Sequence, residues 1–147
     1  MASIERATTE DIPRLNELLT MLFTQEADFR PDPVRQSAGL RLIIENPEIG
    51  HILVLREDSI VGMVNLLYTI STALGDRVAI LEDMIIDPGY RGGGAGSRLL
   101  DGAIAFAKEQ GCRRITLLTD RINSGAIRFY ERHGFTLSEM VPLRLLL

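Results

Sequence analysis

Residues 78–108 constrain the fold more than any other part of the chain. A β-rich run at 78–86 is ended by Asp87, Pro88 and Gly89, and residues 96–108 place apolar side chains at helical spacing. Between them lies a segment that is mostly glycine. Without side chains, successive backbone N–H groups converge on one point, and the start of the next helix adds its positive dipole end. The segment therefore predicts a strand, a loop that binds pyrophosphate, and a helix.

Two common phosphate-binding motifs are excluded by the residues at the end of this loop. A nucleoside-triphosphate loop needs Lys and then Ser or Thr after its last glycine, whereas Gly96 is followed by Ser97 and Arg98. A dinucleotide fingerprint needs Gly-x-Gly-x-x-Gly, but no pair of glycines here reaches a third at that spacing. The strands before the loop also have the pattern of antiparallel neighbours.

The rest of the chain predicts a single α/β domain, residues 1–147, of the α+β type with one mixed sheet. Strand-like and helical patterns alternate, and we find no internal repeat or linker. The expected sheet has about seven strands, mostly antiparallel, with about four flanking helices. Strands are predicted at 4–7, 51–56, 60–70, 78–86 and 115–119, with one or two more at 135–147; helices are predicted from 9–11 onward and at 34–45, 96–108 and 124–132.

Composition narrows the location and partners of the chain. The net charge of −4 and the pI near 5.2 argue against nucleic acid, which is normally bound by a basic patch. Cys112 is the only cysteine, so neither a disulfide within the chain nor a cysteine zinc cluster is possible. The N-terminus has no export signal, and the uncharged stretch 59–75 is too polar to span a bilayer. We therefore expect a cytoplasmic protein that binds no membrane.

Two segments resemble the signatures of the GNAT superfamily of N-acetyltransferases. The run RGGGAG at residues 91–96 looks like the coenzyme A loop of that family, Arg/Gln-x-x-Gly-x-Gly/Ala. Residues 123–135 are similar to the second signature, in which an Asn opens a helix that carries a Tyr and ends at Gly-Phe. The resemblance implies a GNAT-like fold with a splayed pair of strands, and an enzyme that transfers acetyl from acetyl-CoA to an amine by direct attack in a ternary complex. A resemblance to the diamine and polyamine branch, at 71–84, is weaker.

The resemblance also implies which residues bind acetyl-CoA, and it implies no metal. Backbone groups of the splayed strand would hold the pantetheine arm, the loop amides the pyrophosphate, and the second signature the thiol end. The implied cofactor-binding residues are, in this order, Met84, Ile85 and Ile86; Arg91, Gly92, Gly93, Gly94, Ala95, Gly96 and Ser97; and Asn123, Ala126 and Phe129.

Two side chains are the candidate catalytic residues. Tyr130 would protonate the departing thiolate, although its helical spacing also suits a core aromatic. Glu82 is the candidate base, although a strand carboxylate can also be merely solvated. Asp83 alternates to the other face and is expected to be structural; only one of the two can point at the amine, and the sequence leaves open which.

The acceptor is expected to be a small-molecule or peptide amine. The resemblance implies an acceptor site around residues 23–30, residues 65–68 and Glu82. There, Glu26, Asp28, Tyr68 and Glu82 would make a pocket hospitable to a cation. Polyamines, peptide N-termini, amino acids and aminoglycosides stay open as acceptors. The apolar C-terminal run is expected to be either a core strand or part of a homodimer seam. The alternative function is a non-catalytic acetyl-CoA-binding or protein-interaction domain.

Overall fold

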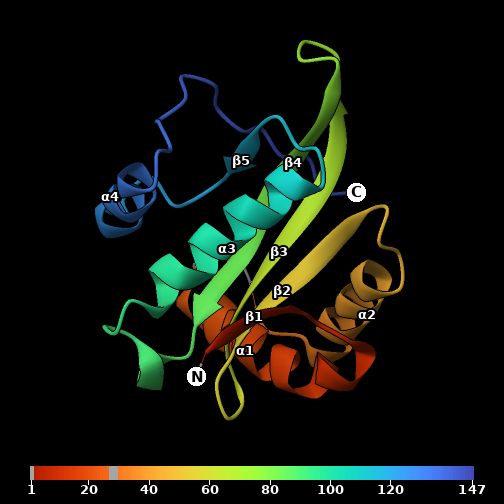
Figure 1. Cartoon of the computed structure of the whole chain (residues 1–147), viewed down its shortest axis with the longest axis vertical. Coiled ribbons are helices and arrows are strands. Elements are labelled where there is room, and N and C mark those ends of the chain that lie inside the picture. The colour runs from red at the N-terminus through yellow and green to blue at the C-terminus, as the bar shows by residue number, and fades with distance from the viewer. Residues whose placement is uncertain (1, 27–29) are drawn as a thin grey trace. The chain divides into compact units, whose positions relative to one another are not determined.

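The computed structural model describes residues 2–26 and 30–147, which divide into two compact units, Met1–Leu117 and Leu118–Leu147. The first unit contains one five-stranded sheet in the order β1-β2-β3-β4-β5 (Figure 1). Its first four strands are antiparallel neighbours, and β5 runs parallel to β4. The strands are β1 (Ser3–Arg6), β2 (Gly50–Arg56), β3 (Ile60–Ser71), β4 (Asp76–Ile86) and β5 (Ile115–Leu117).

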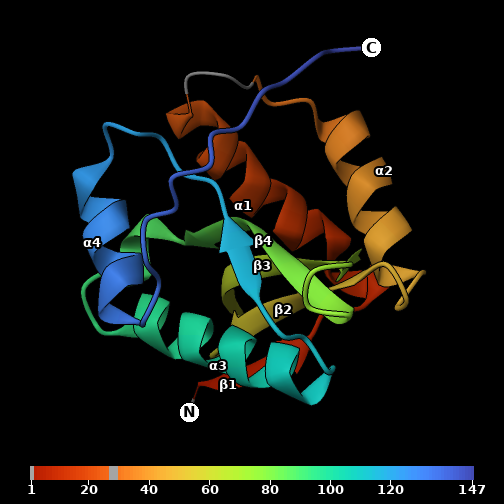
Figure 2. The ribbon, with the colours of Figure 1, turned by 90° about the horizontal axis from the view of Figure 1, so that it is seen from above.

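Three α-helices of the first unit cover the two faces of this sheet. Figure 2 shows α1 (Ile12–Gln25) and α2 (Pro33–Ile44) on one face and α3 (Ala95–Glu109) on the other. Single turns of 3₁₀-helix precede α1 and α3, at Thr9–Asp11 and Pro88–Tyr90. The α/β fold with a mixed sheet is thus confirmed.

Apolar side chains of α1 and α2 form the core on their face of the sheet. Leu15 and Leu18 of α1 are fully buried with Leu40 of α2 and Met63 of β3. The buried Gln36 of α2 hydrogen-bonds α1, so its polar amide costs little to bury. This packing fixes α1 and α2 against the sheet and leaves a hollow between them.

A β-bulge interrupts β4 opposite the middle of β3. Asn65 pairs with Glu82 and Met63 with Ile85, so β4 has one extra residue in this interval. Asp83 lies in the bulge with φ 53°, a left-handed conformation that Asp tolerates better than most residues. Strict alternation of side chains therefore does not hold along this stretch of β4.

The pairing of β4 with β5 is short. It joins Ala79, Ile80 and Leu81 to residues 115–117. Beyond Leu81, β4 has no strand neighbour on its β5 side among the residues that the structure describes. The backbone of residues 82–86 is therefore bound to a strand on one side only.

The second unit consists of α4 (Ser124–Arg132) followed by an extended segment. The rings of Tyr130 and Phe135 lie 5.6 Å apart and those of Phe129 and Tyr130 5.2 Å apart, forming an aromatic cluster at the helix end. Residues 135–147 contain no strand. The prediction of about seven strands is therefore wrong, because a strand needs a hydrogen-bonded neighbour and Pro142 lacks the backbone donor that pairing uses.

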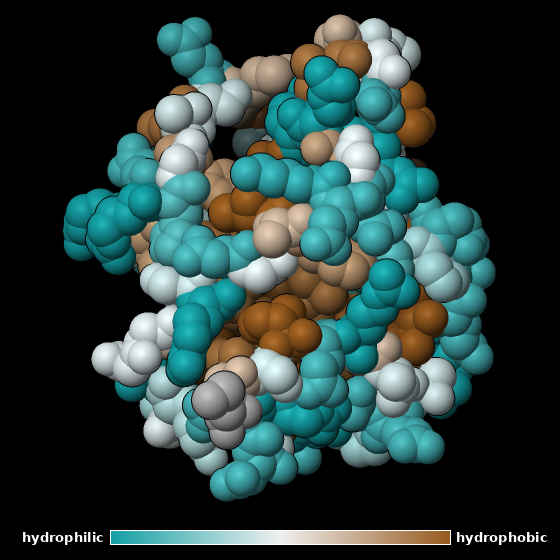
Figure 3. All heavy atoms as spheres, viewed as in Figure 1, coloured by the Kyte–Doolittle hydropathy of each residue, from teal (hydrophilic) through white to brown (hydrophobic). Residues whose placement is uncertain are grey.

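The surface seen in Figure 3 is mostly polar, with apolar side chains exposed between the polar ones. Such a mixture is ordinary for a folded protein. Within the described residues, no helix is long and apolar enough to cross a membrane. The same residues hold no cluster of His, Cys, Asp and Glu side chains suited to a metal ion.

Candidate functional site

The glycine loop that follows β4 adopts backbone conformations that suit glycine. Gly92 has φ 90° and Gly94 φ 80°, and Gly94 is the N-cap of α3 without a side chain to cap it. A Cβ added at Gly92, Gly93 or Gly94 would meet nothing within 4 Å. The first N–H groups of a helix lack partners within it, and the glycines just before α3 leave room beside the backbone. The loop therefore fits the pyrophosphate predicted for it.

Side chains on both sides hold this loop in place. Arg14 of α1 binds the Asp87 carboxylate at 2.7 Å, and Asp87 accepts a hydrogen bond from the Gly89 N–H at 2.9 Å. The Arg14 guanidinium is the main cause that lowers the pKa of Asp87. Arg91 Nε donates to the Ile86 carbonyl at 3.1 Å, which closes the turn at the end of β4.

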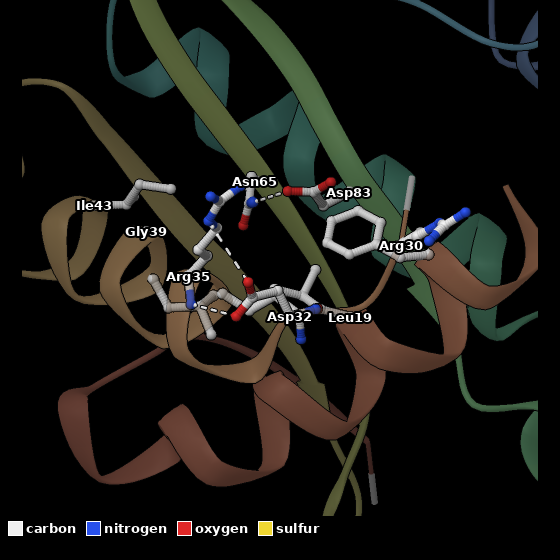
Figure 4. A pocket seen from close by; sticks show the side chains of 11 residues that line it. Leu19, Arg30, Asp32, Arg35, Gly39, Ile43, Asn65 and Asp83 are labelled. Carbon is white, nitrogen blue, oxygen red and sulfur yellow. Dashed lines mark hydrogen bonds and ion pairs between the residues drawn. The ribbon is translucent and has the colours of Figure 1, made fainter. Parts of the chain in front are cut away.

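A pocket of about 340 Å³ lies between α1, α2 and the strands β3 and β4 (Figure 4). This volume suits a small ligand. Apolar side chains of α1 and α2 form much of the wall. The charged and amide side chains in the lining are Arg30, Asp32, Arg35, Gln36, Asn65 and Asp83.

The most perturbed carboxyl in this pocket is that of Asp83. Burial, the largest cause, and the neighbouring Glu82 carboxylate together raise its pKa to about 6, while a hydrogen bond from Asn65 opposes both effects. Asn65 Nδ2 lies 2.6 Å from Asp83 Oδ2. A carboxyl with this pKa changes its protonation close to neutral pH, as a proton-transfer group must.

Two arginines stand at the edge of the same pocket. Arg35 Nε lies 3.5 Å from Asp32 Oδ2, and the Arg35 side chain is 89% exposed. In Figure 4, Arg35 extends from α2 toward the strands, whereas the Arg30 head group points away from Asp83. The lining therefore holds two arginines and two aspartates, rather than the acidic set expected from the sequence.

Phe23, Arg30 and Asn65 of this lining belong to the segments expected at the acceptor site, residues 23–30 and 65–68. Of the side chains expected to attract a cation, those that the structure describes lie elsewhere. The Glu82 side chain is exposed and outside this lining. Tyr68 hydrogen-bonds His51 at 2.6 Å and carries Arg77 over its ring. Glu26 does not line the pocket, and Asp28 lies outside the described residues.

The candidate cofactor residues fall into two groups. Met84, Ile85 and Ile86 occupy the half of β4 that leads into residues 91–97, so these are brought together in the first unit. In the second unit, Asn123, Ala126, Phe129 and Tyr130 share the segment that forms α4. Asn123 Oδ1 accepts a hydrogen bond from the Ala126 N–H at 3.1 Å, so Asn123 is the N-cap of this helix. Burial raises the pKa of Tyr130.

Sequence reasoning missed two features of the pocket. Arg35 and Gln36 line it from α2, a helix to which no function was assigned. The sequence predicted a helix at 34–45, but nothing in the pattern marked which face borders a cavity. Asp83 was expected to be structural, because simple alternation puts it on the other face of the strand from Glu82. The bulge at Asp83 has no glycine that would have signalled it.

Comparisons with known proteins agree with this fold and loop. The model of the acetyltransferase (GNAT) family matches residues 12–135. The uncharacterized N-acetyltransferase YhfO of Bacillus subtilis is 30% identical over 136 residues, which cover 90% of this chain and 89% of YhfO. The chain therefore belongs to the acetyltransferase (GNAT) family, whose members catalyse acetylation that depends on acetyl-CoA.

Other relatives match to differing extents. The aminoalkylphosphonate N-acetyltransferase of Salmonella typhimurium is 28% identical, with 92% of this chain and 85% of that protein covered. The match to uncharacterized N-acetyltransferase MJ1207 of Methanocaldococcus jannaschii, 42% identical over 65 residues, spans only 29% of that protein. A predicted acetyltransferase from Clostridium acetobutylicum, solved with acetyl-CoA, is 18% identical and superposes with a TM-score of 0.77 over 98% of this chain and 96% of its own.

Proposed function

We propose that this protein transfers the acetyl group of acetyl-CoA to the primary amine of a small molecule or peptide by direct attack in a ternary complex. The observation that carries the proposal is the position of Asp83. Its carboxyl, with a pKa raised to about 6, lines a pocket on the same strand that leads into the glycine loop. The strand β4 thus connects Asp83, an acid–base group, to the loop that we propose binds the pyrophosphate.

The chain offers a continuous surface for acetyl-CoA along β4 and the loop. The loop amides from Arg91 to Ser97 would hold the pyrophosphate, and the one-sided backbone of Met84, Ile85 and Ile86 the pantetheine arm. We also propose that Asn123, Ala126 and Phe129 line the thiol end. Bound acetyl-CoA supplies an acetyl thioester, and a backbone N–H of β4 would stabilise negative charge on its carbonyl oxygen.

Asp83 is the better candidate for the general base. It lines the pocket, whereas the Glu82 side chain is exposed. An ionised Asp83 would take a proton from the bound ammonium and leave a neutral amine that can attack. That Glu82 is the base, as expected from the sequence, stays a prediction. Replacing Asp83 by Asn and Glu82 by Gln, one at a time, decides between the two carboxylates.

Tyr130 remains the proposed general acid. An ordinary tyrosine, with a pKa of about 10, is already protonated at neutral pH, and burial raises the pKa of Tyr130 further, so the phenol carries the proton that a donor needs. The phenol would protonate the thiolate that leaves when the amide bond forms.

The acceptor that suits the lining best is an amine that also carries an acidic group. Asp83 would face the amine, and Arg35 would bind the anion, because its exposed ion pair with Asp32 is weak enough to open. The relative named as an aminoalkylphosphonate N-acetyltransferase supports this class of acceptor. A polyamine carries only positive charges and would gain nothing from the arginines.

An amine panel tests the proposed reaction. Release of coenzyme A thiol is followed with aminoalkylphosphonates, amino acids, peptides and diamines, and acetyl-CoA binding is measured separately by calorimetry. We expect thiol release that depends on the amine and is fastest for acceptors with an acidic group. Binding of acetyl-CoA without release on any amine would instead support the non-catalytic alternative.

A further inference from the structure

The amide of Asn65 is the least explained polar group in the pocket. The side chain belongs to β3 and is 3% exposed. Its nitrogen donates to Asp83, but Asn65 Oδ1 is buried without a hydrogen-bond partner, the one such side-chain atom found among the described residues. Buried polar atoms are nearly always paired, so an unpaired oxygen in a pocket lining marks a place for a hydrogen-bond donor.

The orientation of this amide follows from charge. An ionised Asp83 carboxylate accepts hydrogen bonds only, so the NH₂ group of Asn65 must face it and the oxygen must face elsewhere. Figure 4 shows the Asn65 oxygen directed into the pocket while the nitrogen is linked to Asp83. A ligand atom that completes this arrangement must be a hydrogen-bond donor.

We infer that Asn65 and Asp83 form a two-point subsite for the substrate ammonium, with Asn65 as a positioning residue. This inference rests on the proposed function. One N–H of the ammonium binds Asn65 Oδ1 and another binds the Asp83 carboxylate. The proton on the second passes to Asp83, which becomes a carboxylic acid, and the nitrogen keeps both electrons of that N–H bond as its lone pair. The remaining bond to Asn65 holds the neutral amine so that the lone pair is free to attack.

Several charged groups surround Asp83 and bear on how this subsite titrates. Glu82 adjoins it on β4, Asp32 and Arg35 face the pocket from the start of α2, and Arg30 precedes them. The facing residues of α1 are apolar. Asn65 is the neighbour whose hydrogen bond lowers the pKa of Asp83, so its loss moves that pKa upward.

Two variants of Asn65 separate positioning from packing. Asn65→Leu keeps the volume but removes both the donor to Asp83 and the acceptor for the amine. We expect its amine KM to rise about tenfold, the size of effect that one lost hydrogen bond produces. The acid limb of kcat/KM should also move to higher pH. Asn65→Asp keeps an acceptor oxygen but places a second carboxylate beside Asp83, so its acid limb should move to higher pH than that of Asn65→Leu. Affinity for acetyl-CoA should match the parent in both variants.

A binding measurement tests the subsite even if no amine is turned over. The Asp83 carboxyl is titrated by carbon NMR in protein saturated with coenzyme A, with and without n-propylamine. The bound ammonium should lower the pKa of Asp83 in the parent and should do so in Asn65→Leu only at about tenfold higher amine concentration. No change in the parent would overturn the subsite whatever the kinetics show. A normal change in Asn65→Leu, or an unchanged amine KM and pH limb, would show that Asn65 only packs. If Asn65→Leu does not fold, Asn65→Asp is titrated in its place, and an amine affinity and pH limb equal to the parent's would overturn the role of Asn65.

Discussion

Asp83 combines a left-handed backbone with a carboxyl whose ionisation is opposed by its surroundings. The φ of 53° turns its side chain out of the simple alternation of β4, and burial raises its pKa to about 6. Both features cost stability, and such costs are concentrated at functional sites. At the scale of single residues, Asp83 therefore combines a strained backbone with a carboxyl suited to proton transfer.

The first prediction is that Asp83→Asn lowers turnover about 10²–10⁴-fold, the usual contribution of a general base. Asn also tolerates the left-handed region, so the bulge should survive. The matched variant Glu82→Gln should keep turnover within a few-fold of the parent. Steady-state kinetics of both variants check this, and the reverse ranking would return the role of base to Glu82.

The second prediction is that kcat/KM of the parent rises with pH through about 6. Below this pH the Asp83 carboxyl is protonated and cannot accept a proton, and above it the carboxylate is available. A substrate amine with a pKa near that of Lys, about 10, stays an ammonium over this range and does not mask the limb. A profile that is flat from pH 5 to about 8 would contradict the assignment.

The third prediction concerns stability and follows from the same pKa. A folded-state pKa above the unfolded value means that the folded protein holds the proton more tightly. The contribution of Asp83 is thus fully present below about pH 4 and is lost as pH rises through about 6. Asp83→Asn, which cannot ionise, should melt higher than the parent at pH 8, and the difference should shrink at pH 4. Thermal melts at both values check this.

At the scale of elements, the sequence predicted those parts whose signals are local. The helical spacing of apolar residues placed α1, α2, α3 and α4, and the turn residues between strands placed the hairpins of the sheet. The bulge of β4 was not predictable, because it depends on how β3 and β4 pair and carries no glycine. The prediction of one or two strands at 135–147 was wrong. The apolar composition of this segment suggested strands, but no strand in the described part of the chain pairs with it.

In the candidate site, too, the features with local sequence signals were predicted and those that depend on tertiary packing were not. Two signatures of local sequence located the glycine loop and α4, and the loop has the open backbone expected for a phosphate. The acceptor pocket instead gathers side chains from α1, α2, β3 and β4, which only tertiary packing brings together. Arg35 on α2 was therefore absent from the sequence-based expectation, whereas Arg30 and Asn65 lie in segments expected at the acceptor site.

The fourth prediction concerns the loop between β4 and α3. Gly94→Val should lower acetyl-CoA affinity at least about tenfold, because Val resists φ of 80° at the helix N-cap. Gly111→Val is the matched control, since Gly111 has a φ of 83° beyond the other end of α3 and its Cβ would meet nothing within 4 Å. Calorimetric titration measures both variants, with melting curves to show that each is folded. Equal acetyl-CoA affinity in the parent and Gly94→Val would show that the pyrophosphate is bound somewhere other than this loop.

At the scale of the whole molecule, the family match at residues 12–135 runs through both compact units. This supports the proposal that residues 1–147 act as one domain. The C-terminal segment exposes several large apolar side chains, among them Leu143, Leu145 and Leu146. Exposed apolar clusters of this kind mark interaction surfaces.

The fifth prediction is that the protein is a homodimer whose seam includes this segment. Sedimentation analysis should give a dimer for the parent and a monomer for the double variant Leu143→Asp, Leu145→Asp, because buried charges oppose association. Replacement of the exposed Val34 by Asp is the control and should leave the dimer intact. A monomeric parent would contradict the proposal.

Mass spectrometry of the amine product tests the central claim most directly. The protein is incubated with isotopically labelled acetyl-CoA and the best amine of the panel, and the labelled products are quantified. We expect the label on the amine nitrogen in proportion to the coenzyme A released, and we expect Asp83→Asn to slow its appearance. Label recovered only as acetate, or left in acetyl-CoA that the protein demonstrably binds, would contradict acetyl transfer to an amine.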